Sequence, residues 1–69
     1  MADPRTPPDV DALRKWLHQI NNHLGVILAT AELLQLEKLP PQVVERCHTI
    51  EGKAIEVRDV LRAIADHLA

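Results

Sequence analysis

Residues 10–34 read VDALRKWLHQINNHLGVILATAELL, and their apolar side chains recur at alternating intervals of three and four residues. A second stretch with the same spacing occupies residues 43–68. An average interval of about 3.5 residues is typical of helices that pack along a left-handed seam, whereas strands alternate with a period of two. The sequence therefore predicts an all-α protein. The predicted seam consists of Val10, Leu13, Leu17, Ile20, Leu24, Ile27, Ala31, Leu34, Val43, Cys47, Ile50, Ala54, Val57, Leu61, Ile64 and Leu68.

The predicted helix ends are marked by prolines and by residues that cap helices. Thr6 followed by Pro7 is typical of an N-cap with proline at the first helical position, and Asp9 would place a carboxylate near free backbone N–H groups. The run Leu39-Pro40-Pro41 interrupts the seam, because proline disfavours helical backbone before it and cannot donate to the preceding turn. We expect a flexible tail over residues 1–8 and an antiparallel helical hairpin over residues 9–69.

A hairpin of 69 residues has a small core, and such cores rarely supply more than about 3–5 kcal/mol of net stability without a further constraint. Cys47 is the only cysteine, so it cannot form an internal disulfide. Each predicted helix also carries more apolar residues than one seam uses. Two hairpins packed about a twofold axis would bury this excess, which predicts a homodimeric four-helix bundle. A monomeric hairpin with an apolar surface is the alternative. The extra apolar residues are Trp16, Val26, Leu28, Leu33, Leu36, Val44, Ile55 and Val60.

Composition excludes several classes of protein. The net charge of −2 and the pI near 6.0 argue against a nucleic-acid-binding protein, which would carry a basic face. The two glycines, Gly25 and Gly52, are too few for a glycine-rich loop that cradles phosphates. The amino-terminal residues lack the apolar run of a secretory signal, and polar residues interrupt the uncharged stretch 16–31. We therefore expect a cytoplasmic chain without direct membrane insertion.

The segment His18-Gln-Ile-Asn-Asn-His23 is unusual for the middle of a helix, because asparagine has low helix propensity. His18 follows the seam residue Leu17 and should lie on the outer side of the helix. Arg14 and Asn22, one turn before and after it, share that face. An accessible imidazole beside an amide suits phosphoryl chemistry. Solvated surface residues without such a function are the alternative interpretation of the same spacing.

The stretch HQINNHLGVILATAELL, residues 18–34, resembles the phosphoacceptor helix of two-component sensor histidine kinases, in the subgroup with the motif H-D-x-N-N. His18 aligns with the phosphorylated histidine, and Asn21 and Asn22 align with the asparagine pair. The second predicted helix is similar, less specifically, to the second helix of the same dimerization and phosphotransfer domain. The resemblance extends from about residue 11 to the end of the chain.

The resemblance implies a role for each matching residue. His18 would exchange a phosphoryl group with the aspartate of a response-regulator receiver domain, which supplies its own Mg²⁺, so no cofactor is expected in this chain. Asn22 would orient a water or the receiver, and Arg14 would attract the receiver's acidic site. Gln19 stands where the family has a carboxylate, and an amide cannot act as a base for autophosphorylation. The family's ATP-binding domain has no counterpart in this sequence. We therefore expect a phosphotransfer domain rather than a self-sufficient kinase, with a separate histidine kinase as a further candidate partner.

Trp16 and Gly25 are candidate partner-binding residues. Trp16 lies near His18, where it either packs in the dimer or anchors a partner. Gly25 follows His18 by seven residues on nearly the same face, where it either leaves room for a receiver or is simply tolerated. Cys47 is expected to be a small core residue. The histidines lack the spacing of a metal site within one helix, so no metal is predicted.

The sequence leaves two further interpretations open. A degenerate dimeric module could bind a kinase or a regulator without transferring phosphate, and Gln19 is the residue that favours this alternative. An oligomerising helical hairpin unrelated to signalling is the third possibility.

Overall fold

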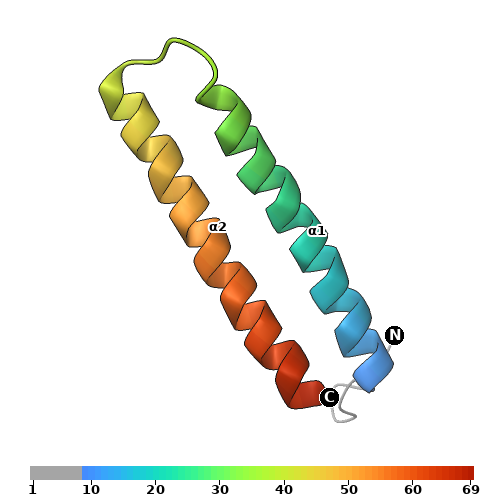
Figure 1. Cartoon of the computed structure of the whole chain (residues 1–69). Coiled ribbons are helices and arrows are strands. Elements are labelled where there is room, and N and C mark those ends of the chain that lie inside the picture. Colours follow the sequence, from blue (N-terminus) through green and yellow to red (C-terminus); the bar gives the residue numbers. More distant parts are fainter. Residues whose placement is uncertain (1–8) are drawn as a thin grey trace, which may run out of the picture.

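The computed structural model describes residues 9–69, which form two long antiparallel α-helices joined by a short loop (Figure 1). Helix α1 comprises Val10–Leu34 and helix α2 comprises Pro41–Leu68. The chain measures 50 × 25 × 16 Å along its principal axes. The prediction of an all-helical hairpin is confirmed for these residues. The predicted tail, residues 1–8, lies outside the described residues.

Helix α1 begins later than the sequence predicted. Asp9 has extended backbone (φ −72°, ψ 165°), and its carboxylate accepts a hydrogen bond of 2.7 Å from the Ala12 backbone N–H. Asp9 is therefore the N-cap, and the prediction that the helix has already begun before Asp9 is wrong. Thr6 itself lies outside the described residues. The physical reason is that Asp is a better N-cap than Thr.

The loop lies at the predicted Leu39-Pro40-Pro41. Pro41 is the first residue of α2, where its missing N–H costs no helical hydrogen bond. Three polar side chains, Gln35, His48 and Glu51, tie the loop to α2, and we term them the hinge clamp. The Gln35 amide donates to a Glu51 carboxylate oxygen, and Gln35 Oε1 lies 2.9 Å from His48 Nε2. The hinge clamp fixes the register of the two helices beside the loop.

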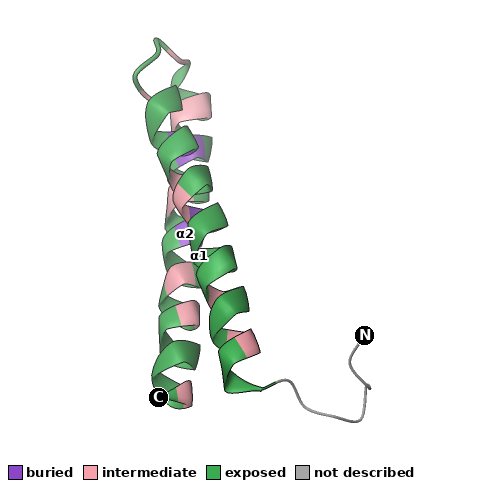
Figure 2. Cartoon of the chain, turned by 90° about the vertical axis from the view of Figure 1, so that its right-hand side faces the viewer, coloured by how far each residue is buried: buried purple, intermediate pink, exposed green. Residues whose placement is uncertain are grey.

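The two helices meet along a contact row of buried and half-buried side chains. Its buried members, Leu24, Ala31, Cys47 and Ala54, expose 2–8% of their surface and gather toward the loop (Figure 2). The members nearer the open end are leucines that remain half-buried (Figure 2). The expectation that Cys47 is a core residue is confirmed. The contact row consists of Leu13, Leu17, Leu24 and Ala31 in α1 and Val43, Cys47, Ala54, Leu61 and Leu68 in α2.

The remaining seam positions are only partly covered in the hairpin, and we refer to them as the uncovered positions. Their exposed fractions fall in the narrow range of 39–47%, so the prediction that they lie between α1 and α2 is wrong. The physical reason is that a single neighbouring helix covers only one edge of an apolar stripe. A stripe with this repeat is wide enough to pack against two neighbouring helices. The uncovered positions are Val10, Ile20, Ile27 and Leu34 in α1 and Ile50, Val57 and Ile64 in α2.

Neither α1 nor α2 combines the length with the apolar content that a bilayer-spanning helix needs.

Candidate functional site

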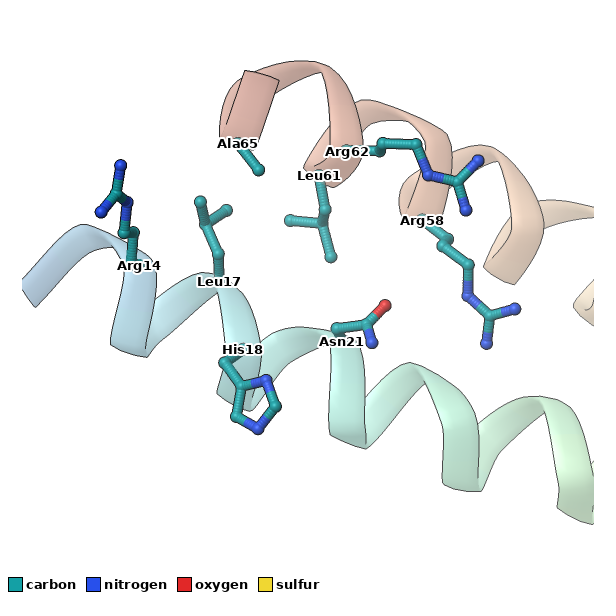
Figure 3. A pocket seen from close by; sticks show the side chains of 8 residues that line it. All are labelled: Arg14, Leu17, His18, Asn21, Arg58, Leu61, Arg62 and Ala65. Atoms are coloured by element: carbon teal, nitrogen blue, oxygen red, sulfur yellow. The ribbon is translucent and has the colours of Figure 1, made fainter. Parts of the chain in front are cut away.

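His18 lies at the rim of an open cleft between the open ends of the two helices (Figure 3). The cleft has a volume of about 540 Å³. Leu17 and Leu61 point toward one another at its base. Polar and basic side chains surround this apolar base, and we term the whole the basic cleft. Its lining is Arg14, Leu17, His18 and Asn21 from α1 and Arg58, Leu61, Arg62 and Ala65 from α2.

Helical geometry explains why these residues meet. Arg14, His18 and Asn21 follow one another at intervals of four and three residues, so they share one face of α1. Arg58 and Arg62 are likewise one turn apart on α2. The antiparallel arrangement places the end of α2 beside the start of α1, as the Arg14 guanidinium shows by donating to the Leu68 carbonyl oxygen at 3.4 Å. The site is therefore assembled from residues of α1 and α2 that lie at least 37 positions apart in the sequence, the separation of Asn21 and Arg58.

The His18 imidazole is exposed, and its ring points away from α2 (Figure 3). The sequence predicted this orientation from the position of His18 immediately after Leu17. A ring in this position is open to an approaching molecule, while its backbone is held by the middle of a long helix. A molecule that approaches from solvent can therefore reach a ring nitrogen without a change in the backbone of the hairpin.

Asn21, rather than Asn22, lines the cleft beside His18. The sequence grouped Arg14, His18 and Asn22 on one face. The structure brings Arg14 and His18 together with Asn21, and Asn22 is exposed outside the cleft lining. The reason is rotation: Asn21 follows the contact-row residue Leu17 by four positions and therefore turns toward α2, whereas Asn22 is one step further round.

The other predicted site residues also lie outside the cleft lining. Gln19 is exposed, and Trp16 exposes 49% of its surface. Trp16 precedes Ile20 by four residues and so belongs to the face that carries Ile20 rather than to the basic cleft. Gly25 is half-buried, and a Cβ atom built on it would meet nothing within 4 Å. The space beside Gly25 is therefore open, and its role in binding a partner stays a prediction.

Arg58 and Arg62 are cleft residues that the sequence analysis missed. Neither forms an ion pair within residues 9–69, where the ion pair found joins Lys53 and Glu56 at 3.0 Å. Figure 3 shows the Arg58 side chain reaching from α2 toward α1 beside Asn21. Their spacing of one turn was visible in the sequence. Their place in the cleft depends in addition on how the two antiparallel helices are aligned along their length, which brings Arg58 and Arg62 to the same cleft as His18.

Metal binding has no geometric support in the described part of the chain. Within residues 9–69, no group of three or more His, Cys, Asp or Glu side chains is placed to hold a metal ion.

The opposite face of the hairpin carries an apolar groove of about 330 Å³. Ile27, Ile50 and Val57 line it together with the contact-row residues Leu24 and Ala54. Thr49 and Lys53 complete the lining. A residue one position after a contact-row residue, such as His18, lies to one side of the contact row, and a residue three positions after it, such as Ile27, lies to the other. The basic cleft and the apolar groove are therefore on opposite faces.

Comparisons with protein-family models, with curated proteins and with solved structures gave no match.

Proposed function

We propose that this chain is a phosphotransfer module of two-component signalling, in which His18 accepts and donates a phosphoryl group. The observation that carries the proposal is an exposed imidazole at the rim of a cleft lined by three arginines. The imidazole is a suitable nucleophile for phosphorus, and guanidinium groups favour the charge that a phosphoryl group carries. The resemblance of residues 18–34 to a phosphoacceptor helix supports the same assignment.

The proposed partner is a response-regulator receiver domain. A ring nitrogen of His18 would attack the phosphorus of the receiver's aspartyl phosphate. The bond between phosphorus and the carboxylate oxygen would break, and the free carboxylate would leave. The reverse transfer regenerates the imidazole. Mg²⁺ would belong to the receiver, and a separate histidine kinase is a second source of phosphate. These partners would place the chain in the cytoplasm.

Asn21 and Asn22 have different roles in this proposal. Asn21 faces the cleft, which favours it for contacts to a bound phosphoryl group. Asn22, on the outer side, would orient a water or part of the receiver. Gln19 has no basic oxygen to accept a proton, so phosphate would arrive by transfer rather than by autophosphorylation.

The apolar groove supports a homodimer as the working form. The uncovered seam residues keep 39–47% of their surface exposed, as expected for positions that one helix covers and a second would finish covering. Completing the burial of such a side chain contributes roughly 1 kcal/mol. A second copy packed on this face would give a four-helix bundle and leave the basic cleft open on each flank.

Phosphotransfer from labelled receivers tests the proposal. A receiver that carries radioactive aspartyl phosphate is mixed with the chain, and label is expected at His18. His18→Ala should abolish the label, whereas His23→Ala, a matched change on the same helix, should keep it. Undiminished labelling of His18→Ala would remove His18 from the mechanism.

The second candidate function is a degenerate interaction module that binds a kinase or regulator without phosphotransfer. The amide of Gln19, in place of a carboxylate, favours it. The same assay separates the two functions, because the degenerate module would form a complex with the receiver while the phosphate stayed on the receiver.

A further inference from the structure

We propose that Arg58 and Arg62 on α2 form a binding site for a phosphoryl dianion beside His18. This inference rests on the proposed function and assigns to α2 a role in it. The two arginines would hold the phosphoryl group in the basic cleft, and the His18 ring, which points away from α2 in this structure (Figure 3), would rotate about its side-chain bonds toward the cleft for the exchange. They are binding residues, distinct from the nucleophile on α1.

The first argument is their position. Arg58 and Arg62 line the same cleft as His18, and the Arg58 side chain crosses toward α1 at the level of Asn21 (Figure 3). Arg58 is half-buried, so part of its hydration is already lost. A guanidinium group that is partly withdrawn from water binds an anion more strongly than a fully solvated one.

The second argument is the charge balance of the cleft. Like charges one turn apart on a helix destabilise it, and neither Arg58 nor Arg62 is neutralised by an ion pair within residues 9–69. Asp66 lies one turn after Arg62, yet the two side chains do not form an ion pair. A bound dianion would relieve the repulsion.

Arg14 differs from these two arginines. Its guanidinium donates to the Leu68 carbonyl oxygen, which places a cation at the carboxyl end of α2, where the helix dipole favours positive charge. Arg14 therefore holds the two helix ends together. Arg58 and Arg62 have no such bond among the described residues, which leaves their N–H groups for a ligand.

The chemistry of the arginine side chain favours a phosphoryl group over other anions. A planar guanidinium donates two parallel N–H groups to two oxygens of one phosphoryl group, and two guanidinium groups match its double charge. The site is confined to one end of a chain with net charge −2, which does not suit the long backbone of a nucleic acid.

Titration with inorganic phosphate tests the site directly on the full chain. NMR spectra of the arginine side chains are recorded while phosphate is added, with sodium chloride at matched ionic strength as the reference. We expect saturable shifts of the Arg58 and Arg62 signals with phosphate and none with chloride. Shifts that do not saturate, or that are equal at Arg46, an exposed arginine of α2 outside the cleft, would overturn the proposal.

Variants then assign the binding. Arg58→Gln and Arg62→Gln, singly and together, should each weaken phosphate binding about tenfold or more, because each removes charge-assisted hydrogen bonds. Arg46→Gln is the matched control and should bind as the unaltered chain does. Circular dichroism verifies that the helices persist in each variant. Unchanged phosphate affinity in the folded double variant would refute the assignment.

The His18→Ala variant separates this inference from the proposed function. It should still bind inorganic phosphate, because the arginines supply the site, while it loses transfer from the receiver. Phosphate binding without transfer in the unaltered chain would refute the phosphotransfer function and leave the anion site standing. Transfer that persists at full rate in the double arginine variant would refute the role of the arginines alone.

Discussion

The basic cleft and the apolar groove lie on opposite faces of the same hairpin, and both are bounded by the same contact row. The side chains that line them differ in chemistry because they follow the contact-row residues by different numbers of positions. At the open end of the hairpin, the residues one or four positions after contact-row residues include His18, Asn21 and Arg58, which are polar, whereas the same steps nearer the loop include the apolar Leu28, Val44 and Ile55. Residues three positions after contact-row residues, among them Ile50 and Val57, are apolar except for Arg46. One helical repeat therefore separates a face suited to an anion from a face suited to another hydrophobic surface.

Of the changes considered, a charge placed in the apolar groove should have the largest effect, because it should prevent association through that face. Val57→Glu would place a carboxylate at a position that a second copy should cover, and an unpaired buried charge costs about 3 kcal/mol or more. Because a twofold dimer carries the substitution twice, we expect dissociation to monomers, measured by analytical ultracentrifugation. Ala63→Glu, which places the same carboxylate at an exposed position of α2 outside the groove, should remain dimeric. A dimeric Val57→Glu variant would rule out this face as the interface.

Salt should affect the two faces differently. Attraction of an anion to the basic cleft is screened as ionic strength rises, with a Debye length of about 10 Å at 0.1 M. Phosphate affinity should therefore fall several-fold between dilute and half-molar sodium chloride. Association through the apolar groove should persist, because hydrophobic burial does not weaken with sodium chloride. Calorimetry for phosphate and sedimentation for the dimer give the two values, and a parallel fall of both would contradict the contrast.

Removal of the α1 cap should loosen the end of the hairpin that carries the basic cleft. Asp9→Ala deletes the acceptor of the Ala12 N–H, and loss of such a cap costs about 1 kcal/mol. Urea unfolding should show this loss, and hydrogen exchange should rise in the first turns of α1 while the residues beside the apolar groove keep their protection. Asp11→Ala removes a first-turn carboxylate of α1 that is not the cap, and it should cost less.

The smallest effect is expected at Gly25, which is one position after Leu24 and therefore on the side of the basic cleft. Gly25→Ala should stabilise the chain by about 0.5–1 kcal/mol, since alanine favours the helix and the added methyl meets no atom within 4 Å. Thermal unfolding gives the gain. Unchanged transfer from a receiver would show that the glycine is simply tolerated, and slower transfer would place the receiver's docking path over it.

Much of the fold could be predicted from the sequence. The spacing of three and four residues predicts the two helices, and Leu39-Pro40-Pro41 predicts the hinge. The start of α1 differs from the prediction because Asp9 competes with Thr6 for the cap and is the stronger capping residue.

The candidate site was only partly predictable. The exposure of His18 follows from its place after Leu17, so one helix suffices to predict it. The choice of Asn21 over Asn22 and the participation of Arg58 depend on which side of α1 is turned toward α2. The same information decides which seam residues stay uncovered. An apolar stripe is wide, so it leaves the rotation of a helix about its own axis undetermined over the width of the stripe. Packing against the other helix sets that rotation.

The side chains of the contact row differ in volume from one level of the hairpin to the next. Leu61 and Leu68 stand at the open end of α2, the smaller Ala54 and Cys47 stand nearer the loop, and Val43 follows beside the loop. Because small side chains let two helix backbones approach and large ones hold them apart, the residue at each level sets the local spacing of the two helices. Ala54→Leu would add bulk where the row is buried, and it should push the helices apart at that level without a change of topology.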